Sequence, residues 1–298
     1  MIKFKNEFPF FAACPSILWQ VIFLLIPLSV LFFISIYDPA VGHGFSAFTF
    51  KFYRELLVYP YLKSIANSCV LASITVVLCI VLSFPTAYQI AFRIKRYKTL
   101  AIVLLLLPSW TNFIVRIYSW FFLLEKDGFL STTLHALGFL RQPHLLGNFF
   151  AVIIGMVYCY FPFMVIPVYS SLIGIDRNLV EASADLGASR IRTFTSVIFP
   201  LAIPGIYAGS VLVFLSGIGE FAVQEILGGA KYAYWGNVVG NLFLDLYNFR
   251  AGAAFTFIGL ICALAIGIGT YFVFKSFSLF IILRRRVDLA RQTRKARM

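Results

Sequence analysis

Long apolar stretches recur along the chain, and short segments between them carry most of the polar and charged residues. Six stretches are long enough to cross a hydrocarbon core of about 30 Å as a helix, which takes about 20 residues. The pattern therefore predicts an all-α, polytopic membrane protein, and we expect residues 1–298 to form one transmembrane domain. The predicted spans are 16–37, 65–92, 99–124, 148–174, 205–227 and 253–274.

Composition excludes a soluble protein. Hydrophobic residues make up 61% of the chain and charged residues only 12%, which is more apolar surface than a soluble fold of this length can bury. The net charge of +13 comes from Lys and Arg clusters between apolar runs, so it indicates topology in a lipid bilayer rather than nucleic-acid binding. The cysteines have no paired spacing typical of a metal site, and none is predicted.

Two basic clusters orient the chain. The segment 93–98 lies between the second and third spans, and the run that begins with Arg284 follows the sixth. Because cytoplasmic segments are enriched in Lys and Arg, both clusters are expected in the cytoplasm. An even number of spans then places both termini in the cytoplasm, together with the segment 175–204.

That segment is too polar for a span and carries helix signals. Asp176 can cap a first helix, Gly187 suits a left-handed stop, and Ser189 can cap a second helix running towards Pro200. Small side chains near Gly187 would allow another protein to approach the backbone closely, as in a docking segment. The alternative is an amphipathic loop lying on lipid headgroups, but such a loop is typically rich in Lys and Arg, whereas here acidic residues balance the basic ones. The apolar positions of the first helix are Leu179, Ala182 and Leu186.

The residues from Glu181 to Gly187, Glu-Ala-Ser-Ala-Asp-Leu-Gly, followed by Val197-Ile-Phe-Pro200, resemble the EAA motif of ATP-binding-cassette (ABC) importer permeases. The sequence departs from that motif at Ser183, Val197 and Phe199. In that family the loop is a coupling helix seated on an ATPase subunit. The resemblance implies the following ATPase-docking residues: Glu181, Ala182, Ser183, Asp185, Gly187 and Pro200.

Two further stretches, Leu107–Tyr118 and Gly219–Gly229, look like those of putrescine/spermidine permeases. The resemblance implies the type I importer permease fold, in a bacterial inner membrane, carrying polyamines. It also implies two ATPase subunits that hold ATP and Mg²⁺, a second permease subunit and an extracytoplasmic polyamine-binding protein. Permeases for iron, sulfate or thiamine share this architecture, so another small solute remains an alternative.

The chain itself shows no sign of enzymatic chemistry. It lacks the glycine-rich phosphate loop that ends in Gly-Lys-Ser/Thr, so we expect ATP to be hydrolysed in a partner chain and no cofactor to be bound here. An HExxH motif is also absent, and no catalytic residue is predicted. A stand-alone secondary transporter is the remaining alternative, although such a carrier has no need of a docking segment.

Charged residues within the predicted spans are candidates for a solute pathway. A charge at the centre of a bilayer costs about 2.5–3.5 kcal/mol on insertion scales, so Arg116, Glu220 and Glu225 are expected to face the protein interior. Glu220, together with Glu225, could offer negative charge to an amine. The alternative, favoured for Glu225, is that each acid pairs with Arg116 or backbone groups to hold helices together.

Trp110 is the aromatic residue expected to meet the solute. It lies beside Pro108 and Asn112, where a broken helix can expose backbone and side chains to a passage. An aromatic ring attracts an ammonium group by about 0.5–2 kcal/mol. Trp110 and Asn112 therefore complete the predicted pathway.

Overall fold

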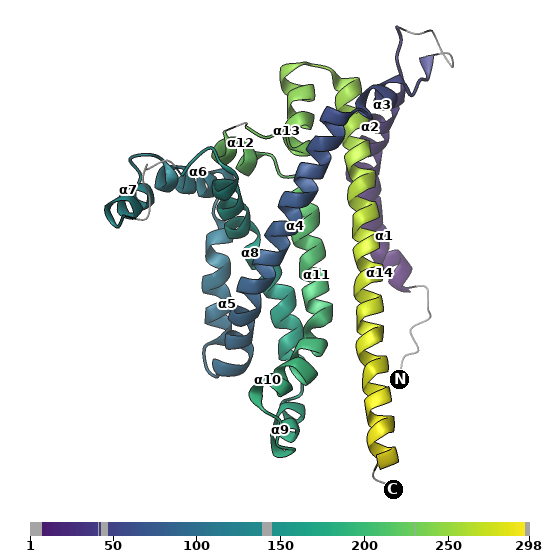
Figure 1. Ribbon diagram of the computed structural model, residues 1–298. Coiled ribbons are helices and arrows are strands. Elements are labelled where there is room, and N and C mark those ends of the chain that lie inside the picture. The colour runs from purple at the N-terminus through teal and green to yellow at the C-terminus, as the bar shows by residue number, and fades with distance from the viewer. Residues whose placement is uncertain (1–7, 41, 43–46, 139–144, 230, 296–298) are drawn as a thin grey trace. The chain divides into compact units, whose positions relative to one another are not determined.

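The computed structural model describes residues 8–40, 42, 47–138, 145–229 and 231–295, and these ranges consist of helices, loops and one isolated bridge between Tyr37 and Phe48. Within these ranges, five helices are long and apolar enough to cross a membrane, or six if one bent pair counts as a single span. The predicted all-α polytopic fold is confirmed (Figure 1). The helices form two compact units, Met1–Leu62 with Val238–Ile261 and Lys63–Asn237 with Cys262–Met298.

The first unit joins the N-terminal span to the start of the last helix. Its helices are α1 (Phe8–Gln20), α2 (Ile26–Ile36), α3 (Lys51–Leu56) and the first part of α14 (Phe249–Lys295). Phe32 of α2 packs edge-on against Phe257 of α14, with 5.3 Å between ring centroids. The Asp38 carboxylate is buried and lies 3.5 Å from the Arg250 guanidinium, so this buried charge has the partner it requires.

The second unit contains both predicted functional regions. α8 and α11 are packed against each other within it, and most of its buried apolar side chains belong to one core cluster. Its helices are most of α4 (Tyr59–Tyr88), α5 (Lys98–Leu106), α6 (Phe113–Leu124), α7 (Phe129–Ala136), α8 (Phe149–Ile173), α9 (Arg177–Asp185), α10 (Arg190–Thr193), α11 (Phe199–Ile218), α12 (Ala222–Gly228) and the start of α13 (Trp235–Gly240).

Two glycines four residues apart bring α11 against α8. A Cβ atom at Gly205 would lie 2.3 Å from the carbonyl oxygen of Pro167, and one at Gly209 would lie 2.6 Å from the sulfur of Met164. The Pro167 oxygen belongs to the backbone and cannot move aside, so at Gly205 the two helices approach this closely only because the residue is glycine; at Gly209 the Met164 side chain would have to shift, and the Met164 backbone would lie 3.3 Å away. Small residues at such spacing are typical of helix contacts in membranes, where close van der Waals packing replaces the hydrophobic driving force.

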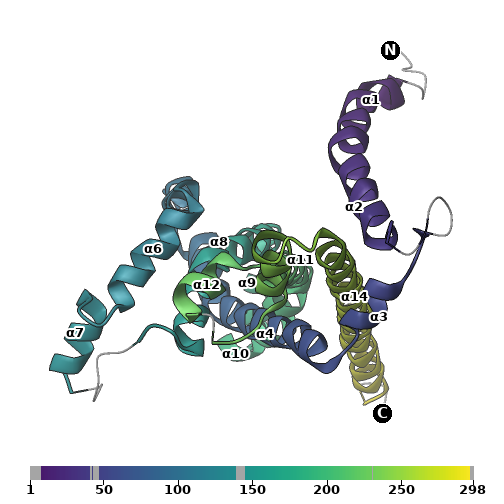
Figure 2. The ribbon, with the colours of Figure 1, turned by 90° about the horizontal axis from the view of Figure 1, so that it is seen from above.

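The predicted third span, 99–124, is not one straight helix. The apolar stretch is bent by 86° between Lys98–Trp110 and Phe113–Ala136. α5 ends in a 3-10 turn that contains Pro108, and Thr111 is extended. The Asn112 side chain then caps α6, since its oxygen accepts hydrogen bonds from the backbone amides of Ile114 at 2.9 Å and Val115 at 3.4 Å. Figure 2 shows α6 and α7 extending sideways from α8 and α12.

The predicted fifth span, 205–227, also has different bounds. A continuous helical stretch runs from Arg190 to Ile218. The helix expected after Ser189 is therefore the beginning of this span rather than a separate short helix ending near Pro200. A π-helical turn over Phe194–Ile198 comes directly before Pro200, where the proline's missing amide interrupts the regular ladder. The helix ends at Ile218, and α12 begins separately at Ala222.

Candidate docking segment and solute pathway

Residues 176–193, which we call the docking segment, fold as the local sequence signals predict. The Asp176 carboxylate caps α9 by accepting a hydrogen bond from the Asn178 amide at 3.0 Å. Gly187 follows the end of α9 with a φ of +76°, a backbone conformation that glycine adopts without strain. The Ser189 hydroxyl caps α10 by accepting from the Arg192 amide at 3.3 Å. The predicted cap, stop and second cap are confirmed.

A hydrogen bond fixes the two helices of the docking segment to each other. The hydroxyl groups of Ser183 and Thr193 are 3.0 Å apart, and Thr193 is buried while Ser183 is half-buried. Ser183 stands where the EAA motif has alanine, so this departure from the motif adds a contact between the two helices. The Ser183 hydroxyl is hydrogen-bonded to Thr193 within the docking segment.

The exposed face of the docking segment combines large apolar and acidic side chains. Leu186 is 88% exposed and Ile191 is 77% exposed. Leu186 was expected on the apolar face of the first helix, but it follows the last residue of α9 and points away from any packing. No sequence signal predicted the exposure of either Leu186 or Ile191. The predicted docking residues that are exposed are Glu181, Ala182, Asp185 and Gly187, whereas Pro200 is half-buried in α11 beyond the segment.

Glu220 lies at the opposite end of α11 from the docking segment (Figure 1). It is only 8% exposed, and its Oε1 accepts hydrogen bonds from the backbone amides that begin α12. The Tyr160 hydroxyl donates to its Oε2. The partners of Glu220 are thus backbone groups and Tyr160 rather than Arg116. The amides that donate to Oε1 belong to Phe221 at 3.1 Å, Ala222 at 2.8 Å and Val223 at 3.3 Å.

Glu225 is the accessible acid of this region. It lies on α12, its side chain is exposed, and the side-chain amide of Asn237 donates a hydrogen bond to its Oε2. The remaining carboxylate oxygen of Glu225 can accept from another donor. The two acids therefore differ in access, since Glu220 is buried and Glu225 is exposed.

Trp110 and Asn112 lie at the bend between α5 and α6. The Trp110 ring is 72% exposed, while the Asn112 oxygen is used in capping α6. The predicted break beside Pro108 is confirmed by the 86° bend. Trp110 thus presents an exposed ring, and Asn112 shapes the backbone that carries it.

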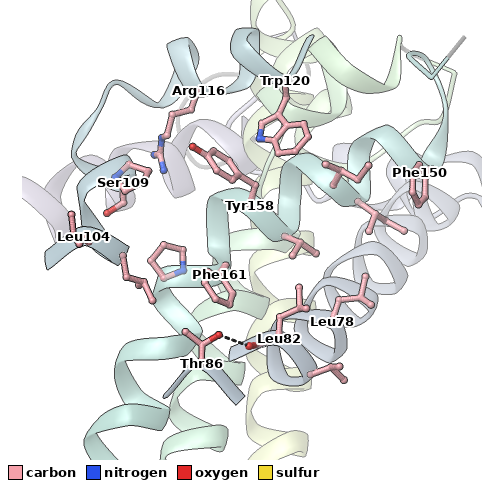
Figure 3. A pocket seen from close by; sticks show the side chains of 17 residues that line it. Leu78, Leu82, Thr86, Leu104, Ser109, Arg116, Trp120, Phe150, Tyr158 and Phe161 are labelled. Carbon is pink, nitrogen blue, oxygen red and sulfur yellow. Dashed lines mark hydrogen bonds between the residues drawn. The ribbon is translucent and has the colours of Figure 1, made fainter. Parts of the chain in front are cut away.

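Arg116 is separate from the acids. Neither ion pair among the described residues involves it, and its guanidinium lies over the Phe113 ring, 5.4 Å from the centroid. Its side chain lines a cavity of about 720 Å³ between α4, α5, α6 and α8 (Figure 3). The structure therefore does not bring Arg116 together with Glu220 or Glu225.

Comparison with known proteins places the whole chain in one group. Residues 8–281 match the family model described as "Binding-protein-dependent transport system inner membrane component". The chain is 36% identical to the spermidine/putrescine transport system permease protein PotB of Haemophilus influenzae, over 96% of this chain and 98% of that protein. It is 40% identical to PotB of Escherichia coli over 70% of this chain and 76% of that protein.

Solved structures share the fold. The chain resembles a crystal structure of a bacterial ABC transporter involved in the import of the acidic polysaccharide alginate, with a TM-score of 0.68 over 91% of this chain and 96% of that chain, at 17% identity. It also resembles the MetNI methionine ABC transporter in an inward-facing conformation, with a TM-score of 0.51 over 76% of this chain and 97% of that chain, at 15% identity. Together with the family match, this shows that the chain belongs to the binding-protein-dependent transport system inner membrane components.

Proposed function

We propose that this chain is the transmembrane permease subunit of an ABC importer that carries polyamines such as putrescine and spermidine across a bacterial inner membrane. The observation that carries the proposal is the 36% identity to the H. influenzae spermidine/putrescine permease over 96% of the chain. The solute is an amine-bearing cation, and the chain offers it an exposed carboxylate at Glu225 and an exposed ring at Trp110.

Energy enters through the docking segment. Its exposed Leu186 and Ile191 suit an apolar groove on a partner, and the partner is a cytoplasmic ATPase that binds ATP and Mg²⁺. Two such ATPases, a second permease subunit and an extracytoplasmic polyamine-binding protein complete the importer. When the ATPases close on ATP, the docking segments are drawn together and the spans reorient.

The topology follows from charge. The basic segment 93–98, which precedes α5, lies at the same end of the second unit as the docking segment (Figure 1). Lys and Arg are enriched on the cytoplasmic side. This supports a cytoplasmic docking segment and, with six spans, cytoplasmic termini; residues 1–7 and 296–298 lie outside the described part of the chain.

The exposed acid is the group that meets the solute in this proposal, and the buried acid orders the backbone beside it. Glu220 holds the start of α12 and is saturated by its own partners, so it acts on the solute only through its charge. Glu225 lies within α12, and its Oε1 accepts no hydrogen bond from the part of the chain that the structure describes. An ammonium group bound to a carboxylate makes a charge-assisted hydrogen bond.

Glu225→Gln is expected to lower the initial rate of polyamine uptake at least about tenfold, because a hydrogen bond to a charged group contributes about 1.5–3 kcal/mol. The measurement is uptake of radiolabelled putrescine and spermidine into cells that carry the whole importer, compared with the native chain.

Glu55→Gln is the matched control, since Glu55 is an exposed acid of α3 that forms an ion pair with Lys51 at 3.9 Å; the uptake of this variant is expected to be native. Normal uptake by Glu225→Gln would remove that acid from the pathway. If the native importer carries no polyamine, the solute belongs to another class, such as iron, sulfate or thiamine. Uptake into liposomes that contain this chain and no ATPase would favour the stand-alone carrier.

A further inference from the structure

The short helix α12 carries the exposed Glu225 and lies directly against α8. A Cβ atom at Gly155 of α8 would lie 2.4 Å from a methyl carbon of Leu227 and 2.9 Å from one of Val223. The apolar side chains of α12 therefore rest on the backbone of α8, at a position where that helix has no side chain. We call this the α8–α12 contact, and it sets where Glu225 is presented.

α12 is held in place at its two ends. At its start, the Glu220 carboxylate accepts hydrogen bonds from the Tyr160 hydroxyl of α8 and from the first amides of α12. At its end, the Leu227 carbonyl oxygen accepts from the Gly147 amide at 2.9 Å, and Gly229 follows with a φ of +60°. The chain leaves the helical conformation on both sides of α12, and such points are where a segment can turn as one piece.

The middle of α12 contains a buried polar side chain without a hydrogen-bond partner. Gln224 is only 2% exposed, and neither its Oε1 nor its Nε2 atom forms a hydrogen bond within the part of the chain that the structure describes. An amide that has left water and gained no partner costs free energy. Native proteins keep few such groups. An apolar side chain of similar length at residue 224 would therefore make the α8–α12 contact more stable than glutamine does.

We propose that Gln224 is a positioning residue that keeps α12 detachable, and that α12 separates from α8 during each transport cycle and carries Glu225 with it. The inference rests on the proposed function, because Glu225 is the acid that meets the solute there. Away from α8, the Gln224 amide regains hydrogen bonds with water, whereas the bond between Tyr160 and Glu220 is lost. The two positions of α12 can be close in free energy because these effects oppose each other.

Cys159 is a native reporter of this separation. It is 1% exposed and lies four residues beyond Gly155, on the face of α8 that α12 covers. Cys79 of α4 is also buried and reports a general opening of the helices. In the assembled importer in nanodiscs, both thiols are alkylated with N-ethylmaleimide, and peptide mass spectrometry gives the two rates. The rate at a buried thiol follows the population of the opened state.

Gln224→Met is expected to stabilise the α8–α12 contact, because it removes the amide and keeps the length of the side chain. Alkylation of Cys159 relative to Cys79 is expected to slow about tenfold, which corresponds to about 1.4 kcal/mol, and the melting temperature of the complex is expected to rise. A side chain that only filled the core would give the opposite change in melting temperature. The maximal rate of putrescine uptake is expected to fall, because α12 separates less often.

Tyr160→Phe is expected to act in the other direction. It keeps the ring and removes the hydroxyl that donates to Glu220, so alkylation of Cys159 relative to Cys79 is expected to speed up about tenfold. An unchanged rate in this variant would overturn the proposal. So would an unchanged or faster rate in the Gln224→Met variant, which would indicate that Gln224 binds a buried water at the α8–α12 contact.

Gln89→Met is the matched control. Gln89 is an exposed glutamine that begins the π-helical turn after α4, and its amide is already open to water, so alkylation, melting temperature and uptake are expected to be native. Slower alkylation of Cys159 in the Gln224→Met variant together with native uptake would also contradict the proposal, because α12 would then not need to separate. The alkylation rates require no solute, so they test the movement even if the native importer carries no polyamine.

Discussion

Leu186→Asp is expected to release the proposed ATPase and abolish polyamine uptake, while the permease itself stays folded in the membrane. Leu186 is 88% exposed, so it contributes little to packing within the chain, and its apolar surface is available to a groove on the partner. If Leu186 is a hot spot of the interface, its loss costs about 2 kcal/mol, which weakens binding about thirtyfold. A buried aspartate adds the cost of desolvating a charge. The measurements are co-purification of the ATPase and uptake of radiolabelled polyamine.

The chain provides a closely matched control at Leu137. This residue also follows the last residue of a short helix, α7, and precedes a glycine with a φ of +76°, and its side chain is 64% exposed. Leu137→Asp is expected to leave ATPase binding and uptake unchanged. Glu181→Lys reverses an exposed charge of the docking segment and is expected to weaken the complex in the same direction. An intact complex in the Leu186→Asp variant would rule out the docking surface described here.

Gly205→Val is expected to prevent stable folding of the permease. Even the Cβ atom would approach the Pro167 carbonyl oxygen to 2.3 Å and the Ser171 hydroxyl oxygen to 2.4 Å. The carbonyl belongs to the backbone of α8 and cannot rotate away, so the two helices must separate. Overpacking of a core typically costs about 1–3 kcal/mol and sometimes more, and this site is at the upper end because valine adds two methyl groups beyond the Cβ. The measurement is the yield and melting temperature of detergent-solubilised protein.

Gly269→Val tests the same substitution where space is open. Gly269 lies in α14, and no heavy atom is within 4 Å of the Cβ position. This variant is expected to fold with native yield, because valine adds only lipid-facing surface there. Equal stability of the Gly205→Val and Gly269→Val variants would contradict the close approach of α8 and α11.

Local signals allowed part of the fold to be predicted well. The fourth span was expected at 148–174 and is Phe149–Ile173, because Asn148 caps the helix through the Ala151 amide at 2.9 Å and Gly174 follows its end. The docking segment was found for the same reason, since Asp176, Gly187 and Ser189 each act on the backbone within three residues. Signals of this kind need no tertiary partner.

Helix breaks inside apolar stretches were harder to predict. The chain stays mainly apolar on both sides of Gly219, Glu220 and Phe221, so a single span to residue 227 with a charge inside it was expected. In the structure the Glu220 carboxylate instead accepts a hydrogen bond from an amide at the start of α12. The same carboxylate accepts a hydrogen bond from the Tyr160 hydroxyl, which lies 60 residues earlier in the sequence. The contact between Gly205 and Pro167 was likewise not predicted, because only the packed helices reveal which glycines face a neighbour.

The continuous helical stretch from Arg190 to Ile218 has a mechanical consequence. Its 29 residues form a lever arm of about 44 Å, and a rotation of about 10° about the docking end displaces the opposite end by about 8 Å. The break at Gly219 lies at that far end, where Glu220 holds the start of α12. A rotation driven at the docking segment would therefore move the end where the acids lie, without any sliding of α11 along its own axis.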